Sequence, residues 1–175
     1  GIAVVNSGSS WYNGVYITDS GNHRVVKFDL LLNTEQGTIG EEGSDLGQFD
    51  TPTGISVSDY RPEANHADDG NIYVADSAND RVVVLHVNDA GEFYVVTTLE
   101  YGFTAPISVA AFYGRVYTVD NEGNMYYTRR RYNNYENVFN TAIGALPGDI
   151  HVDTHGALYI SANHKILKYA FDYNP

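Results

Sequence analysis

An all-β fold made of repeated antiparallel sheets is predicted by three features of the sequence. Residues 15–29 (VYITDSGNHRVVKFD) and 72–86 (IYVADSANDRVVVLH) align without a gap, and an internal repeat indicates a repeat architecture. Short runs rich in Val, Ile and Tyr recur between turn residues, which is typical of strands. No stretch with the apolar period of an α-helix competes with them. The chain is therefore expected to consist of similar β units in series.

Each unit contains the same succession of predicted strands. A short apolar strand comes first, at 1–5, 54–58, 107–111 and 149–153. A strand centred on a tyrosine follows, at 15–19, 72–76, 116–120 and 158–162. A third strand follows a tight turn, at 24–30, 81–87, 125–131 and 165–171. A fourth is expected in the first three units only, at 34–39, 93–99 and 137–141.

The spacing of the central tyrosines predicts a β-propeller. Tyr16, Tyr73, Tyr117 and Tyr159 are 57, 44 and 42 residues apart, and a polar insertion at 60–69 lengthens the first interval. About 40–45 residues is the period of a propeller blade. The strand 82–85 is apolar on both faces, as a blade packed between two others requires. The predicted blades span residues 1–48, 49–101, 102–143 and 144–175, and the last blade lacks its outer strand.

Three runs resemble NHL repeats, a family of β-propellers: DSGNHRVVKFD, DGNIYVADSANDRVVV and LGQFDTPTGISV. The resemblance is close over 15–87, whereas the third unit keeps Asp120 but has Met125 and Tyr126 after Asn124. It implies a propeller, and members of the family usually close six blades. About four antiparallel blades are therefore expected to belong to a larger propeller or to one completed by another chain, with a closed four-bladed ring as the remaining alternative.

Polar residues recur at one turn of the repeat, and we interpret them as scaffold. The positions are Asp19, Asn22, Arg24, Asp76, Asn79 and Arg81. An aspartate at a turn accepts backbone N–H groups, and an arginine can bridge to a neighbouring segment. Catalysis needs an asymmetric arrangement of groups, so residues repeated in successive blades are expected to be structural.

No metal, cofactor or catalytic residue is predicted. Acidic turns at 68–70, 120–123 and 153–156 offer carboxylates, but their spacing does not match a calcium loop, and hairpins favour the same residues. His151 and His155 are four residues apart, which would place them together on a helix. Here the segment is predicted to be strand and turn, so the spacing of the two histidines does not indicate a metal site.

One basic cluster is a candidate interaction site. Arg129, Arg130 and Arg131 precede Tyr132 and Tyr135, and basic residues beside aromatic ones bind single-stranded nucleic acid by charge and stacking. On a strand, however, alternate side chains face opposite ways, so the three arginines cannot line one surface. Ion pairing with acidic neighbours is the first interpretation, binding of a polyanion or glycan the second, and RNA binding the third.

Charge and composition limit the classes of partner. The formal net charge of −12 disfavours nucleic acids and anionic membranes as partners. The longest apolar runs are far shorter than a membrane span, so no membrane insertion is expected. There is no cysteine, which excludes disulfides and thiolate sites. Fifteen tyrosines against three lysines favour an extracellular or cell-surface location.

The predicted function is a non-catalytic structural or interaction module. Its expected partners are proteins, including further copies of itself, or glycans, and an exposed blade edge invites pairing with another chain. Two alternatives stay open. One is a metal-dependent propeller lyase or hydrolase with its site on the axis, and the other is an RNA-binding NHL propeller.

Overall fold

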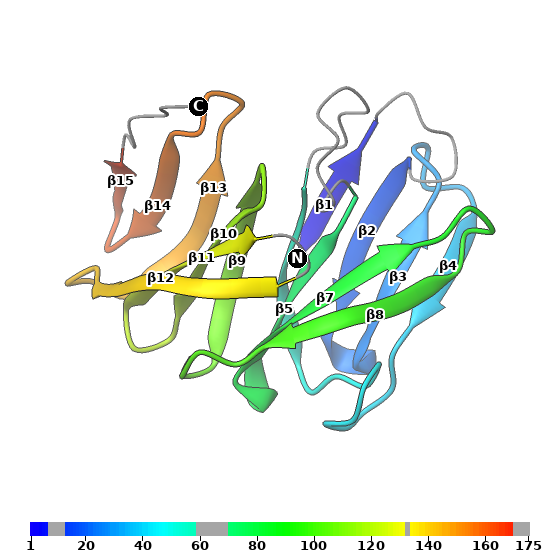
Figure 1. Cartoon of the computed structure of the whole chain (residues 1–175). Helices are drawn as coiled ribbons and strands as arrows, with labels where there is room; N and C mark the ends of the chain where they lie inside the picture. The colour runs from blue at the N-terminus through cyan, green and yellow to red at the C-terminus, as the bar shows by residue number, and fades with distance from the viewer. Residues whose placement is uncertain (7–12, 59–69, 132–133, 170–175) are drawn as a thin grey trace.

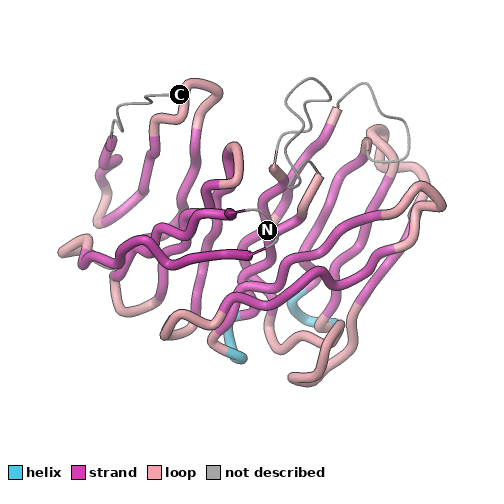
Figure 2. The backbone as a smooth tube through the Cα atoms, viewed as in Figure 1, coloured by secondary structure: helices cyan, strands magenta, loops and turns pink. Residues whose placement is uncertain are grey.

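The predicted all-β propeller fold is confirmed by a computed structural model, which describes residues 1–6, 13–58, 70–131 and 134–169. Four antiparallel sheets follow one another along the chain and form four propeller blades (Figure 1). Figure 2 shows that strands make up most of the backbone, with two short 3₁₀ turns, Ser20–Asn22 and Ser77–Asn79. In every sheet the strands lie side by side in sequence order.

The strands of the four blades are as follows. Blade 1 contains β1 (Ile2–Val5), β2 (Gly14–Asp19), β3 (Arg24–Phe28) and β4 (Glu35–Ile39). Blade 2 contains β5 (Pro52–Val57), β6 (Ile72–Asp76), β7 (Arg81–Val87) and β8 (Phe93–Leu99). Blade 3 contains β9 (Pro106–Phe112), β10 (Arg115–Asp120), β11 (Asn124–Arg131) and β12 (Asn134–Ala142). Blade 4 contains β13 (Pro147–Val152), β14 (Leu158–Ala162) and β15 (Lys165–Tyr169).

Strand positions agree with the sequence pattern, and the main differences lie at strand ends. The outer strand β12 begins at Asn134, earlier than the predicted 137, because it pairs along the whole of β11 from Arg131↔Asn134 to Asn124↔Ala142. Insertion 60–69 lies outside the described residues. Within the described part of blade 4, three strands are present.

Each blade has two faces, because successive side chains of a strand point to opposite sides. We name the face toward the preceding blade the leading face and the face toward the following blade the trailing face. Tyr16 and Val25 lie on the trailing face of blade 1 and pack against Ile72, Val74 and Leu85 on the leading face of blade 2. The seam is apolar on both sides, so burying it stabilises the contact by the hydrophobic effect.

Three apolar clusters fill the three seams between successive blades. The central tyrosine of each trailing face lies at the middle of its seam: Tyr16 and Tyr73 are fully buried, and Tyr117 is nearly so. Each blade therefore stabilises mainly its neighbours, as in other repeat proteins. The side chain of Lys27 is buried in the first seam, with its Nζ 5.9 Å from the centre of the Tyr16 ring. This burial lowers the pKa of Lys27.

Hydroxyl groups join the blades near their inner strands. Thr18 Oγ1 donates a 2.6 Å hydrogen bond to the carbonyl oxygen of Thr53, and Ser77 Oγ donates one of 2.6 Å to that of Pro106. The same step between blades 3 and 4 is made by Ser108 Oγ, which donates to Asp149 Oδ1 at 2.5 Å. Within the described residues, no helix is long and apolar enough to cross a membrane.

Candidate functional site

The repeated turn of blade 2 holds the segment that connects blade 1 to blade 2. Arg81 Nε donates to Asp76 Oδ2 at 2.8 Å, and this ion pair is almost completely buried. The Nη atoms of Arg81 donate to the carbonyl oxygens of Ser44, Asp45 and Gln48, at 2.6, 3.2 and 2.9 Å. A buried guanidinium with several acceptors is well suited to such a bridging role.

Asn79 and the backbone complete this turn. The Asn79 side chain donates to Gly43 O at 2.8 Å and to Asp76 Oδ2 at 2.9 Å. The other carboxylate oxygen of Asp76 accepts the backbone N–H of Asp50 at 2.7 Å. The polar side chains of this turn therefore bind backbone of the same chain.

In blade 1 the equivalent side chains make fewer contacts. Arg24 Nε and Asn22 Nδ2 each donate to Asp19 Oδ2 at 2.9 Å. Both members of the ion pair are partly exposed, and within the described residues Arg24 does not bind a connecting segment. The hydrogen bond from Asn22, followed by that from Arg24, lowers the pKa of Asp19.

The described side chains of the basic cluster make separate contacts. Arg129 donates to Glu136 Oε1 at 2.6 Å, whereas the Arg130 guanidinium lies 5.6 Å from the centre of the Tyr135 ring. The hydroxyl of Tyr135 bonds to Tyr73 Oη at 3.0 Å in the seam between blades 2 and 3. The Tyr132 residue lies outside the described part of the chain, as does the Arg131 side chain. Arg130 and Tyr135 are thus brought together, and Arg129 pairs separately with an acid.

Carboxylates at the acidic turns bind backbone N–H groups. Asp153 Oδ1 accepts the N–H groups of His155 and Ala157 at 2.9 Å, and the bond from Ala157 is the main cause that lowers the pKa of Asp153. Asp120 Oδ1 accepts those of Glu122 and Asn124. The turn 68–70 falls mostly outside the described residues. In the ranges that are described, no three His, Cys, Asp or Glu side chains gather closely enough to hold a metal ion.

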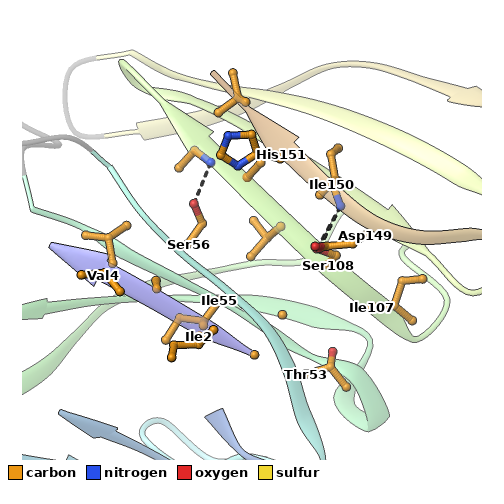
Figure 3. Close-up of a pocket in the computed structure, with 18 of the residues that line it drawn as sticks. Ile2, Val4, Thr53, Ile55, Ser56, Ile107, Ser108, Asp149, Ile150 and His151 are labelled. Carbon is orange, nitrogen blue, oxygen red and sulfur yellow. Dashed lines mark hydrogen bonds between the residues drawn. The ribbon is translucent and has the colours of Figure 1, made fainter. Parts of the chain in front are cut away.

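An axial hollow of about 710 Å³ lies among the inner strands β1, β5, β9 and β13 (Figure 3). Apolar residues of β1 and β5, among them Ile2, Val4 and Ile55, form much of its wall. Polar side chains also line it, among them Ser56, Ser108, Asp149 and His151. The sequence pattern did not single out the first three as site residues. A weak signal was available, since each stands in the first strand of its unit.

Ser56, Ser108 and Asp149 are held in the hollow by hydrogen bonds between blades. Ser56 Oγ accepts the backbone N–H of Ala111 at 3.0 Å, and Asp149 Oδ1 accepts both Ser108 Oγ and the N–H of Ile150. Ser108 Oγ therefore donates its hydrogen bond to a carboxylate and not to a histidine. These residues do not form a Ser-His-Asp relay. What the hollow offers is a set of oriented hydrogen-bonding groups beside an apolar wall.

Within the described residues, two blade faces have no neighbouring blade against them. On the leading face of blade 1, Ile2 and Val4 are 62% and 64% exposed. Ile17 and Phe28 are half-buried on the same face. Val15 and Val26 complete this apolar face and are buried. The trailing face of blade 4 carries these residues: His151, Tyr159, Ser161, Ile166 and Lys168.

Comparisons with known proteins support the fold and leave the family open. No family model matches the chain, and no curated protein matches it. Among solved structures, the hydrazine synthase of Kuenenia stuttgartiensis matches over 91% of this chain, with a TM-score of 0.65 and 14% identity. A structure of a nidogen/laminin complex matches over 96%, with a TM-score of 0.64 and 14% identity. Virginiamycin B lyase from Staphylococcus aureus matches over 93%, with a TM-score of 0.56 and 13% identity.

These neighbours include both enzymes and interaction proteins. The chain spans 40%, 57% and 53% of the length of the three matched chains, in the same order. At such low identity the likeness concerns the fold alone, because one fold hosts many unrelated functions. The NHL assignment therefore rests on the motifs of the first two blades, while the β-propeller fold is established for the chain as a whole.

Proposed function

We propose that this chain is a non-catalytic protein-interaction module whose contact surfaces are its two free blade faces. The observation that carries the proposal is the apolar leading face of blade 1, on which Ile2 and Val4 are mostly exposed. Clustered apolar side chains at a surface mark protein contacts, whereas single ones do not. The proposed setting is extracellular or at the cell surface, in line with the tyrosine-rich and lysine-poor composition.

The partner that fits this face is a further propeller blade. Each of the other three leading faces is covered by the trailing face of the blade before it. The side chains on the free face are of the same kind as those in the first seam, with branched aliphatic residues on adjacent strands. A blade from another chain, or from another part of a longer chain, would bury this surface as the internal seams are buried.

Accessibility of a single cysteine tests the proposal. The chain contains no cysteine, so Val4→Cys introduces one thiol on the free face. We expect this thiol to react with a maleimide in the purified 175-residue polypeptide when it is dilute enough to be monomeric, and to be protected in material isolated under native conditions from the source. Leu31→Cys serves as the matched control, because Leu31 is exposed in the β3–β4 hairpin and belongs to no strand of either face. Equal, rapid labelling of Val4→Cys in both preparations would overturn the proposal.

A second candidate function is binding of a glycan in the axial hollow. Ser56, Asp149 and His151 offer hydroxyl, carboxylate and imidazole groups beside an apolar wall, a combination suited to a polyol. A glycan array probed with the wild type and with Asp149→Asn tests it. Binding that is lost in Asp149→Asn supports this function, and the absence of binding to any glycan contradicts it. The metal-dependent enzyme and RNA-binding alternatives stay predictions.

A further inference from the structure

We infer that the occupant of the free leading face of blade 1 is blade 4 of a second copy of this chain. The inference rests on the proposed function and names the partner. Two copies joined in this way at both ends would form a C2-symmetric ring in which each free face meets its counterpart. Two copies of the 175-residue polypeptide contribute eight described blades, and closed propellers contain about 4–8.

The free leading face of blade 1 repeats the leading face of blade 2, which is buried inside the molecule. Ile2 pairs with Ile17 in blade 1 as Ile55 pairs with Val74 in blade 2. Val4 pairs with Val15 in the same way as Val57 pairs with Ile72. The blade 2 residues pack against the trailing face of blade 1. The exposed side chains Ile2 and Val4 therefore stand where a trailing face is received.

Blade 4 presents a trailing face that matches the trailing face of blade 1. Tyr159 is the repeat equivalent of Tyr16, and Lys168 faces Tyr159 across the strands as Lys27 faces Tyr16. The two lysines also take the same pose, with Nζ 5.2 Å from the Tyr159 ring centre and 5.9 Å from that of Tyr16. Since Lys27 is buried in the first seam, a lysine at this position is compatible with a packed seam.

The next pair of strand residues extends this equivalence. Ser161 pairs with Ile166 in blade 4 as Thr18 pairs with Val25 in blade 1. Val25 is fully buried against blade 2, whereas Ile166 is 74% exposed. Ile166 is thus a large apolar side chain at a position that is buried in the internal seam.

The two free faces are different from each other and complementary, so each seam of the dimer joins two unlike faces. A trailing face meets a leading face, as at every internal seam, and like faces do not meet. With two copies, both seams of the ring are equivalent by the two-fold axis. A substitution on either face therefore removes both seams of a homodimer, but one seam survives when two differently substituted chains are mixed.

Sedimentation velocity over a range of concentrations tests the inference with the whole 175-residue polypeptide. Wild type is expected to be a dimer, and Val4→Arg and Ile166→Arg are each expected to be monomeric at concentrations where the wild type is dimeric. An equimolar mixture of the two variants is expected to form a heterodimer, with at least tenfold weaker association than the wild type because one of its two seams is disabled. Leu31→Arg, at a position that belongs to no strand of either face, is the matched control and keeps the wild-type behaviour.

A wild type that is monomeric at all concentrations overturns the inference. Dimerisation lost in Val4→Arg but kept in Ile166→Arg indicates that two leading faces meet, and also overturns it. Both substituted side chains are exposed, and circular dichroism verifies that the variants are folded. A monomeric wild type whose Val4→Cys thiol is protected in native material leaves the proposed function standing and rejects the second copy as the partner.

Discussion

The turns of blades 1 and 2 share the pattern Asp-x-x-Asn-x-Arg but differ in their surroundings. In blade 2, Arg81 and Asp76 are 8% and 0% exposed, and Arg81 binds three carbonyl oxygens of the connecting segment. In blade 1, Arg24 and Asp19 are 37% and 28% exposed, and their ion pair is the main contact. This difference shows that the motif forms the turn, whereas the segment packed on the turn determines how much each side chain contributes to stability.

Blade 3 solves the same structural problem with a different side chain. It lacks the arginine, and Tyr126 Oη lies instead 3.0 Å from Asp120 Oδ2 and 2.9 Å from the carbonyl oxygen of Gly102, so its single proton is shared between these two acceptors. The tyrosine thus contacts both the turn carboxylate and the preceding connecting segment, as Arg81 does. Because the tyrosine is neutral, less charge has to be removed from water at this turn.

The largest expected effect comes from removing the buried arginine. Arg81→Ala leaves the Asp76 carboxylate buried without its ion-pair partner, and breaking a buried pair costs about 3–5 kcal/mol. Arg24→Ala, its matched control, removes a partly exposed pair, for which about 0–1 kcal/mol is typical. Urea unfolding followed by circular dichroism measures both. Equal losses in the two variants would show that burial by the connecting segment does not distinguish the turns.

An intermediate effect is expected for Tyr126→Phe. The substitution removes the hydroxyl that lies within hydrogen-bond distance of Asp120 and Gly102. A buried acceptor left unsatisfied costs about 1–3 kcal/mol. The free energy of unfolding from urea titrations at neutral pH is the measurement. A loss as large as that of Arg81→Ala would contradict the view that a neutral donor makes the smaller contribution.

The contribution of Tyr126 is also expected to depend on pH. Burial, followed by the bond to Asp120, raises the pKa of Tyr126 to about 12, above the ordinary value of about 10. The folded state therefore favours the protonated phenol, so this stabilisation is complete below pH 10 and is lost as the pH rises from 10 to 12. The stability difference between wild type and Tyr126→Phe should shrink over that range. A constant difference between pH 9 and pH 12 would contradict the assignment.

The smallest effect is expected in acid, at the exposed turn. The pKa of Asp19 is lowered in the folded state, so its stabilising contribution is present above the ordinary pKa and is lost as the pH falls through the lowered value. The urea midpoints of wild type and Asp19→Asn should differ slightly at pH 7 and converge below the lowered pKa. A difference that grows on acidification would reject this explanation.

Much of the fold could be predicted from the sequence because it depends on local periodicity. The central tyrosines, the apolar third strands and the turn residues each place a strand within a few positions, and the repeat gives the order of the blades. The sequence shows Tyr126 in place of the arginine, but the role of this tyrosine escaped prediction, because its contacts to Asp120 and Gly102 depend on how the connecting segment packs. The axial hollow was missed for a similar reason: Ser56, Ser108 and Asp149 come from three different blades.

The sequence by itself determined the blade, its strand order and its turn chemistry, since these follow from contacts between residues near one another in the chain. The tertiary structure alone decided which copy of each motif is buried, because burial depends on a neighbouring blade or connecting segment. It also decided which faces stay open. Ile2 resembles Ile55 in sequence and register, yet one is exposed and the other buried, since a preceding blade of this chain covers only the second.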